Sequence, residues 1–246
     1  MTPPIYHARP DARFYGHAMG IIVLDCVQPN IPGDVANAST YRYPVLFEPV
    51  DGLTPIAAKS GDPALEQAVV EAACRLEARG VKAISSNCGF LHRYQEAIAC
   101  AVQVPVLMSA LQQLPMVLAG LSTDAEVGVI TADAGMLGDA LLQLAVGART
   151  DRLRVTGLQD SPEFRRAMRN QAGALDAARL EREVAEAAAA LVATHPAIQA
   201  IVLECAVFPP YARAVSRRCA LPVFDFITML DWLFAGTHPR EYTGLY

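Results

Sequence analysis

The sequence has 246 residues, a formal net charge of -5 and 53% hydrophobic residues, a composition that excludes a disordered chain and suits buried parallel strands. Lysine and arginine are scattered without a basic stripe, so we expect no nucleic-acid partner. The first 14 residues lack a basic segment followed by a long apolar one, so we expect a cytoplasmic protein. The charge-free stretch 97–122 is interrupted by prolines and glutamines, so we predict no membrane span.

The predicted elements alternate short apolar strands with longer amphipathic helices, a pattern typical of parallel α/β sheets. The predicted strands are 19–24, 81–85, 104–108, 127–131, 154–157, 200–203 and 223–226. Helices rich in alanine, leucine and glutamate are predicted over 63–79 and 175–193, each ahead of a strand that leads to a cysteine. Segment 28–43 is too rich in turn-forming residues to be regular, and it is either a lid or an ordinary surface loop.

Two segments of the chain share one spacing without a gap. In the segments that start at Cys88 and Cys205, a tyrosine follows after 6 residues and a proline after 17. We infer that the chain is a duplicated α/β unit: two similar lobes, each a parallel sheet flanked by helices, related by pseudo-twofold symmetry. We assign residues 1–120 plus 224–246 to the first lobe and 121–223 to the second.

The duplication would place Cys88 and Cys205 on opposite walls of a cleft between the lobes, beyond the carboxyl ends of the strands. Unpaired N–H groups at such strand-to-helix turns favour an anion, so we expect them to lower a thiol pKa and to hold a substrate carboxylate. A thiolate and a thiol that face each other can remove a proton from one face of a carbon and return one to the other face. The alternative is that both are ordinary buried cysteines.

None of the six cysteines forms a C-x-x-C pair or shows zinc-ligand spacing, so we expect no metal site. Proton transfer between two thiols also needs no cofactor, and we expect none. A cysteine hydrolase is the main competing enzyme class. His92, four residues after Cys88 on the same expected helix, would point away from the sulfur, which disfavours that class. Glu204 would point to the opposite face from Cys205 by strand alternation, but a role in orienting the cleft stays open.

The chain resembles the aspartate/glutamate racemase superfamily, which includes amino-acid and hydantoin racemases, maleate isomerases and arylmalonate decarboxylases. The resemblance rests on the segments SSNCGFL at 85–91 and LECAVFPPY at 203–211, and on the strand ends at 24–25 and 131–133. It spans roughly residues 18 to 232. It implies a cofactor-independent enzyme of two α/β lobes with one catalytic cysteine from each.

By position in these segments, the resemblance implies that Cys88 and Cys205 are the acid/base pair. It further implies substrate-binding positions around both sulfurs, namely Asp25, Asn87, Gly89, Phe90, Thr131, Ala206 and Val207. Amino-acid racemases of this group commonly carry Cys-Asn-Thr and Cys-Thr, whereas this chain has Cys-Gly-Phe and Cys-Ala-Val. Side-chain donors for a free amino acid are therefore depleted, which favours a substrate with a less polar α-substituent.

We therefore expect an isomerase: a cofactor-independent racemase or epimerase that inverts the α-carbon of an amino acid or related small carboxylate. Within the family, the alternatives are a maleate-type cis–trans isomerase and an arylmalonate-type decarboxylase. From another class, the alternative is a non-catalytic protein that binds small carboxylates. The aromatic C-terminal segment 231–246 leaves a homo-oligomer contact open.

Overall fold

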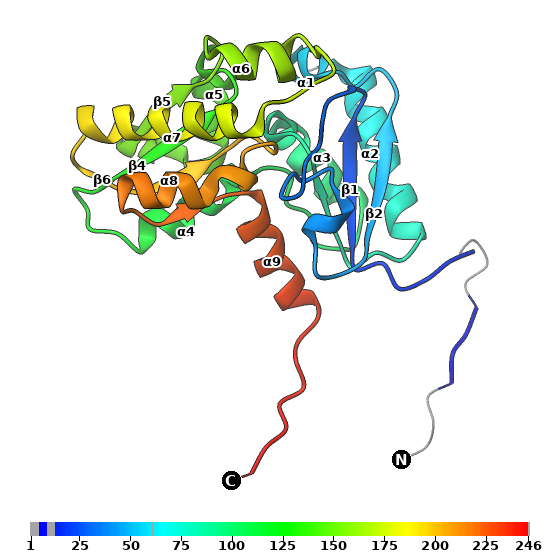
Figure 1. Ribbon diagram of the computed structural model, residues 1–246. Helices are drawn as coiled ribbons and strands as arrows, with labels where there is room; N and C mark the ends of the chain where they lie inside the picture. The colour runs from blue at the N-terminus through cyan, green and yellow to red at the C-terminus, as the bar shows by residue number, and fades with distance from the viewer. Residues whose placement is uncertain (1–4, 9–12, 61, 246) are drawn as a thin grey trace.

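The computed structural model describes residues 5–8, 13–60 and 62–245, which form two parallel sheets flanked by helices (Figure 1). The first sheet has the order β2-β1-β3 and the second β5-β4-β6-β7. The strands are β1 (Met19–Leu24), β2 (Val45–Val50), β3 (Ala83–Ser86), β4 (Glu126–Thr131), β5 (Leu153–Gly157), β6 (Ile198–Leu203) and β7 (Val223–Phe224). The predicted α/β fold class is confirmed.

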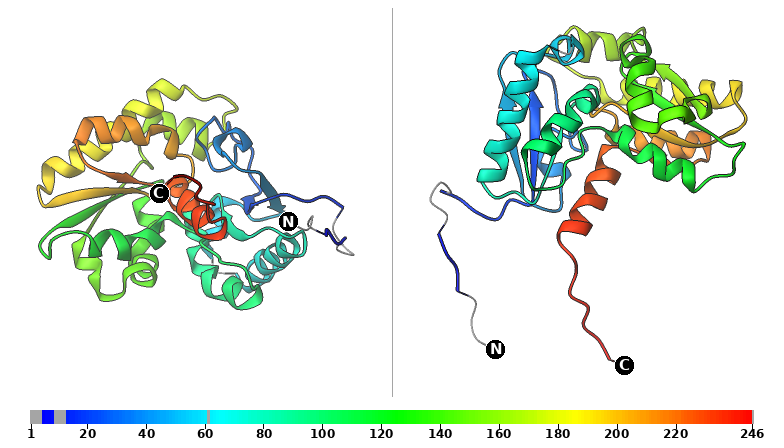
Figure 2. Two further views of the ribbon diagram at one scale, coloured as in Figure 1. Left: turned by 90° about the horizontal axis from the view of Figure 1, so that it is seen from below. Right: turned by 180° about the vertical axis from the view of Figure 1, so that it is seen from behind.

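Helices connect the strands and lie on both sides of the two sheets (Figure 2). They are α1 (Pro55–Ser60), α2 (Pro63–Ala78), α3 (Gln95–Ala101), α4 (Leu114–Ala119), α5 (Ala134–Val146), α6 (Pro162–Phe164), α7 (Ala177–Thr194), α8 (Ala212–Cys219) and α9 (Phe226–Thr237). Asp62 caps α2 by accepting the Ala64 N–H, with Pro63 as the first helical residue, the usual chemistry of a helix start. In the part of the chain that is described, no helix is long and apolar enough to cross a membrane.

Two strand predictions differ from the structure. Strand β2 was not predicted, because Glu48 and Pro49 interrupt its apolar run; β2 lies at the edge of its sheet, where a proline is tolerated. The predicted strand 104–108 is reduced to a single bridge between Val106 and Ile84. Pro105 lacks the N–H group that a longer ladder would need.

The second sheet separates two hydrophobic layers by simple alternation. Along β6, Ala200 and Val202 face the cluster that contains α5, whereas Ile201 and Leu203 face the cluster that contains α7. Helix α7 buries Leu180, Val184, Ala188 and Leu191 on one side, a spacing of three to four residues that gives one apolar stripe. The sheet therefore has no exposed face, which explains its almost continuous apolar sequence.

The two sheets repeat the same pairing. Strand β1 pairs in parallel with β2 and β3, and β4 pairs in parallel with β5 and β6. The pair Ile201–Val223 lies 117 residues after the bridge Ile84–Val106 (201 − 84 and 223 − 106), which is also the separation of Cys88 and Cys205 (205 − 88). The sequence repeat thus corresponds to a repeat of sheet order and register.

One hydrophobic cluster runs through both halves of the molecule. It joins Ile22 and Ile84 of the first sheet to Val129 and Val202 of the second. Helix α9 adds a buried face to the same cluster and contacts β3 and β7, and Figures 1 and 2 show it descending from the junction of the two halves. The exact division into two lobes, with 224–246 assigned to the first, stays a prediction.

Candidate active site

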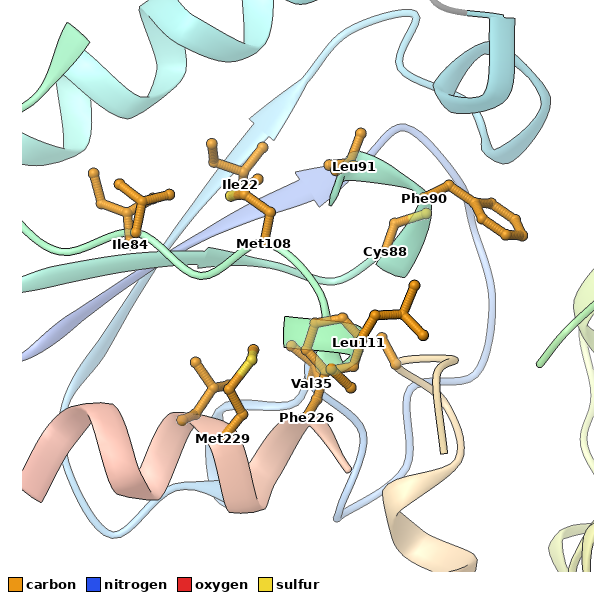
Figure 3. Close-up of a cluster of buried hydrophobic side chains, with 14 of the residues drawn as sticks. Ile22, Val35, Ile84, Cys88, Phe90, Leu91, Met108, Leu111, Phe226 and Met229 are labelled. Atoms are coloured by element: carbon orange, nitrogen blue, oxygen red, sulfur yellow. The ribbon is translucent and has the colours of Figure 1, made fainter. Parts of the chain in front are cut away.

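Cys88 lies in the turn that follows β3, directly before the 3-10 helix η2 (Gly89–Tyr94). The Ser86 hydroxyl accepts the Cys88 N–H at 3.3 Å and lies 2.7 Å from the Met108 carbonyl, which fixes the turn against the neighbouring segment. Cys88 is 8% exposed and sits at the edge of the cluster shown in Figure 3. In that view the Phe90 ring points away from the core residues Ile84 and Met108.

Cys205 occupies the equivalent turn after β6, before the 3-10 helix η6 (Pro209–Tyr211). It is partly buried, and the Val207 N–H is directed at its sulfur. At Cys88 the N–H groups of Phe90 and Leu91 play that part. These turn amides therefore serve the thiols themselves, besides any role they have toward a substrate carboxylate.

A cavity of about 370 Å³ contains both cysteines, a size at the small end of ligand sites. Its walls come from the carboxyl ends of β1, β3, β4 and β6, where ligands bind in open α/β sheets. The lining residues are Leu24, Gln28, Thr54, Pro55, Ile56, Asn87, Cys88, Gly89, Phe90, Ala132, Asp133, Met136, Phe164, Met168, Arg169, Gln171, Glu204, Cys205 and Val207.

Glu204 is a buried carboxylic acid in this wall. It is 1% exposed, and its Oε2 accepts the Thr131 hydroxyl at 2.7 Å. Its Oε1 lies 1.7 Å from the place where a Cβ on Gly89 would be, so the carboxyl group fills the space that any other residue at position 89 would need. The strand ends before Glu204, so strand alternation does not turn its side chain away from Cys205.

The thiol pKa values move in the direction opposite to our expectation. Burial, and then the Glu204 carboxylate, raise the pKa of Cys88 to about 12, and the N–H groups of Phe90 and Leu91 only partly oppose this. The pKa of Cys205 is also raised, for the same two leading reasons. The expectation of a lowered pKa at rest was wrong because the turn amides are outweighed by desolvation and by a like charge.

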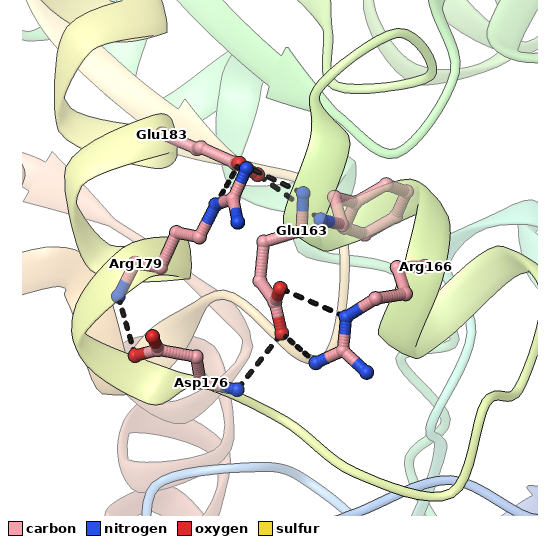
Figure 4. A network of polar contacts seen from close by, with 6 residues as sticks. Glu163, Arg166, Asp176, Arg179 and Glu183 are labelled. Atoms are coloured by element: carbon pink, nitrogen blue, oxygen red, sulfur yellow. Dashed lines mark hydrogen bonds and ion pairs between the residues drawn. The ribbon is translucent and has the colours of Figure 1, made fainter.

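Segment 161–171 forms one wall of the cavity and is fixed by a polar network (Figure 4). Glu163 accepts hydrogen bonds from Arg166 Nη2 (2.6 Å) and the Asp176 N–H (2.8 Å). The Glu183 carboxylate accepts the N–H groups of Glu163 and Phe164 at the start of α6. This network holds in place the part of the chain that supplies Phe164, Met168 and Arg169 to the cavity.

The same segment supplies Arg169, which forms a charged pair in the cavity lining with Asp133 from the turn after β4. Arg169 Nη1 lies 3.6 Å from Asp133 Oδ2, and the Arg169 side chain is 53% exposed. Asp133 also caps α5 by accepting the Met136 N–H. Gln171, two residues after Arg169, accepts the Val27 N–H from the other half of the molecule at 3.0 Å, which links the wall to the loop after β1.

The structure brings together most of the predicted site residues. Cys88, Cys205, Asn87, Gly89, Phe90 and Val207 line the cavity. The side chain of Asn87 is held in place, because its Oδ1 accepts the Leu24 N–H at 2.9 Å.

Three of the predicted positions lie outside the cavity lining. Asp25 is exposed and accepts the Gly52 N–H with Oδ2. Thr131 is buried behind Glu204, and the Ala206 carbonyl accepts the Val35 N–H. Asp25 follows the last residue of β1, and its carboxylate is held by the turn at Gly52, whereas its neighbour Leu24 lines the cavity.

Loop 28–43 packs on the Cys205 turn through the Val35–Ala206 hydrogen bond. Its polar side chains are used inside the loop: Thr40 accepts the Gly33 N–H, Asn37 accepts the Ser39 N–H, and the Tyr41 hydroxyl donates to the Val35 carbonyl. Among these 16 residues only Gln28 lines the cavity. The loop therefore supports the Cys205 turn and contributes the Gln28 side chain to the cavity lining.

The cavity combines two thiols, a buried carboxyl, an arginine–aspartate pair and a wall of aromatic and methionine side chains. Within the described ranges, no group of three or more His, Cys, Asp or Glu side chains could hold a metal ion. This set of groups can exchange protons with a small substrate that contains both a charged and an apolar part.

Residues 36–233 match the family model described as Asp/Glu/hydantoin racemase, and the chain belongs to that family. This confirms the resemblance seen in the two cysteine segments.

Curated relatives carry another activity in their names. Dimethylsulfoniopropionate lyase 5 of Emiliania huxleyi (strain CCMP1516) is 34% identical over 238 residues, which cover 93% of this chain and 47% of the relative. A dimethylsulfoniopropionate lyase of Durusdinium sp. clade D is 30% identical over 235 residues, covering 93% of this chain and 77% of the relative. The chain thus spans about half the length of the first relative.

Solved structures confirm the fold. Arylmalonate decarboxylase superposes with a TM-score of 0.62 at 16% identity, over 91% of this chain and 94% of that one. Glutamate racemase RacE1 from Bacillus anthracis superposes with a TM-score of 0.57 at 14% identity, over 90% and 83%.

Our expectation of a racemase or epimerase, and of an isomerase as the enzyme class, was wrong. The relatives that match most of this chain at 30–34% identity are named as lyases. Two matched cysteines indicate proton transfer, but they do not reveal whether the proton returns to the same carbon or a leaving group departs instead. That outcome depends on the substrate, which the two motifs do not encode.

Proposed function

We propose that the chain is a lyase that cleaves a sulfonium carboxylate of the dimethylsulfoniopropionate type into a dialkyl sulfide and an unsaturated carboxylate. The observation that carries the proposal is the single cavity in which both thiols, a buried carboxyl and an aromatic wall meet, in a chain related to enzymes named for that reaction. A small carboxylate substrate is also consistent with the family.

The reaction needs a base for a weakly acidic C–H bond. In this proposal a cysteine thiolate removes a proton from the carbon next to the substrate carboxylate. The electrons of that C–H bond form the new C=C bond, and the C–S bond breaks with its electron pair on sulfur. The positively charged sulfonium leaves as a neutral sulfide, and one proton is released overall.

The charges around the thiols suit a cationic substrate. Burial and Glu204 raise both thiol pKa values, so the site is poor at ionising its thiols alone. A sulfonium group bound nearby supplies the missing positive charge and favours the thiolate. The rings of Phe90 and Phe164 and the thioethers of Met136 and Met168 offer a polarizable surface for its alkyl groups.

Arg169 is the candidate partner of the substrate carboxylate. It lines the cavity and lies 3.6 Å from Asp133, a distance beyond a normal hydrogen bond. A substrate carboxylate can replace this long contact with a shorter charge-assisted pair. We assign the base role to Cys88, because two N–H groups support its thiolate and one supports that of Cys205.

The test uses the purified full chain with dimethylsulfoniopropionate. Released dimethyl sulfide is measured by headspace gas chromatography and the acid product by proton NMR. Wild type should form the two in equal amounts, and Cys88→Ser should lower kcat by about 100-fold or more, the usual contribution of a general base. Cys100→Ser is the matched control, because Cys100 is exposed and outside the cavity lining. Absence of sulfide from wild type, or full activity in Cys88→Ser, would contradict the proposal.

A further inference from the structure

Glu204 is held between the two halves of the site. Its Oε2 accepts the Thr131 hydroxyl from the end of β4, and its Oε1 fills the space beside Gly89, which directly follows Cys88 in the other half. Its own neighbour in the chain is Cys205. The carboxyl group therefore touches the turn of one cysteine and is adjacent in sequence to the other.

Among the residues that the structure describes, no cation lowers the pKa of this carboxyl group. Burial raises the pKa of Glu204 to about 7, and the Thr131 hydrogen bond is the one contact that lowers it. The thiols of Cys88 and Cys205 face it, and the charge of Glu204 raises the pKa of both. Glu204 thus exchanges its proton near neutral pH, whereas the thiols hold theirs more tightly.

Other titratable groups act on the thiols from neighbouring elements. Asp34, from loop 28–43, raises the pKa of Cys205, and Cys26 raises that of Cys88. Asp133 and Arg169 are the further charged residues in the cavity lining, and they are paired with each other. Among the titratable groups around the two thiols, Glu204 raises the pKa of each thiol most.

An elimination leaves the enzyme with one proton too many. After the thiolate of the base has taken a proton from the substrate, both products leave without it, so the thiol must lose that proton before the next elimination. A thiol whose pKa is raised to about 12 releases a proton slowly unless an acceptor lies close by.

We propose that Glu204 tunes the two cavity thiols and accepts the proton of the Cys88 thiol when the next sulfonium substrate binds, with Thr131 and Gly89 fixing its carboxyl group. The S–H bond breaks, the proton moves to the carboxylate, and the resulting carboxylic acid releases it to water once the products have left. This role rests on the proposed lyase function, whereas the tuning of the thiols does not.

The first arm of the test needs no substrate. The rate of iodoacetamide labelling of Cys88 and Cys205 is measured from pH 6 to 9 by peptide mass spectrometry, in wild type and Glu204→Gln, with Cys100 as the internal control. Removing the negative charge should lower the thiol pKa values. A decrease of about one unit makes labelling at pH 8 about tenfold faster, while labelling of Cys100 stays unchanged.

The second arm measures turnover of dimethylsulfoniopropionate. Glu204→Gln should lower kcat by about 100-fold, because the acceptor is lost, and Glu204→Asp should restore part of it. Faster labelling together with slower turnover, in a protein whose midpoint of urea unfolding is not lower than that of wild type, is the expected signature. A loosened structure would also expose the buried thiols, but it would lower that midpoint. Thr131→Val keeps the carboxyl group but removes its hydrogen bond, so the acidic limb of the kcat profile should move to higher pH.

Each outcome decides a separate point. Equal labelling rates in wild type and Glu204→Gln across the pH range, or unchanged kcat in Glu204→Gln, would overturn the role of Glu204. If Glu204→Gln does not fold, a kcat profile of Thr131→Val that coincides with wild type would overturn it. If wild type releases no sulfide, the lyase proposal and the proton-acceptor role fail together, and the labelling arm still decides the tuning of the thiols.

Discussion

Replacing Gly89 with alanine tests the packing at the centre of the site. The new Cβ would lie 1.7 Å from Glu204 Oε1 and 2.6 Å from its Cδ, distances at which the carboxyl group must move. Overpacking of this kind costs about 1–3 kcal/mol. If the displaced carboxylate also loses its Thr131 hydrogen bond, a further 1.5–3 kcal/mol, roughly, is lost.

When both effects apply, the free energy of unfolding should therefore fall by about 2.5–6 kcal/mol in Gly89→Ala. For a chain of this size, about 2–4 °C of Tm is lost per kcal/mol, so calorimetry should show a decrease of about 5–24 °C. Gly236→Ala is the matched control, because Gly236 is an exposed residue of α9 with nothing within 4 Å of its Cβ position. There the substitution should be neutral or stabilising by less than about 1 kcal/mol.

A double-mutant cycle shows whether Glu204 is the cause. In a Glu204→Ala background the carboxyl group is gone, and the backbone oxygen of residue 204 remains at 2.9 Å. The cost of Gly89→Ala should then shrink, with a coupling energy of about 0.5–3 kcal/mol. Equal costs in both backgrounds, or a Gly89→Ala protein as stable as wild type, would refute the packing argument.

Three further predictions concern pH, the wall of the cavity and the substrate. Burial raises the pKa of Glu204 from 4.5 to about 7, so the stability contributed by its protonated form is present below about pH 4.5 and is lost as the pH rises through 7. In urea unfolding, Glu204→Gln should therefore gain stability relative to wild type as the pH rises from 4.5 to above 7. A difference in stability that stays constant with pH would contradict the raised pKa. Glu163→Ala removes the buried carboxylate that accepts the Asp176 N–H and an Arg166 N–H. The change should cost about 1–3 kcal/mol by urea unfolding, against less than about 0.5 kcal/mol for the exposed control Glu71→Ala. Arg169→Ala should raise the KM for dimethylsulfoniopropionate about 10- to 100-fold at nearly constant kcat. Arg165 lies outside the cavity lining, so Arg165→Ala should leave KM unchanged. An unchanged KM in Arg169→Ala would show that Arg169 is not the partner of the substrate carboxylate.

The fold class and the two cysteines could be predicted from the sequence because each copy of the repeat is a short continuous segment. Equal spacing from Cys88 and from Cys205 requires only that each turn follow its strand in the same way, and the structure repeats the sheet order and register. Apolar runs also located most strands. Strand β2 was missed because its proline and glutamate are tolerated only at a sheet edge, which a linear pattern does not reveal.

The far wall of the cavity could not be found in this way. Phe164, Met168 and Arg169 come from a segment with no motif, and they reach the cavity because the Glu163 network and the Gln171–Val27 hydrogen bond hold that segment there. These contacts join residues far apart in the sequence. The sequence did carry one local signal for Glu204. This residue lies next to Cys205 and directly follows the last residue of β6, so strand alternation does not have to turn its side chain away from the cysteine.

The thiol pKa values were also outside the reach of the motifs. Amides at a strand-to-helix turn lower a thiol pKa only if the sulfur stays solvated and no like charge is near. Cys88 is buried and faces Glu204, and both effects raise its pKa. Burial and the position of a side chain 116 residues away are properties of the folded chain (204 − 88).

One experiment tests the central claim most directly. Dimethylsulfoniopropionate is incubated with the full chain in D2O, and one proton NMR time course follows the substrate, dimethyl sulfide and the unsaturated acid, beside a Cys88→Ser sample. The lyase account predicts that substrate disappears with equal amounts of the two products, and that the variant forms them at least about 100-fold more slowly. Exchange of the hydrogen next to the carboxylate without any sulfide, or no reaction at all in wild type, would contradict it.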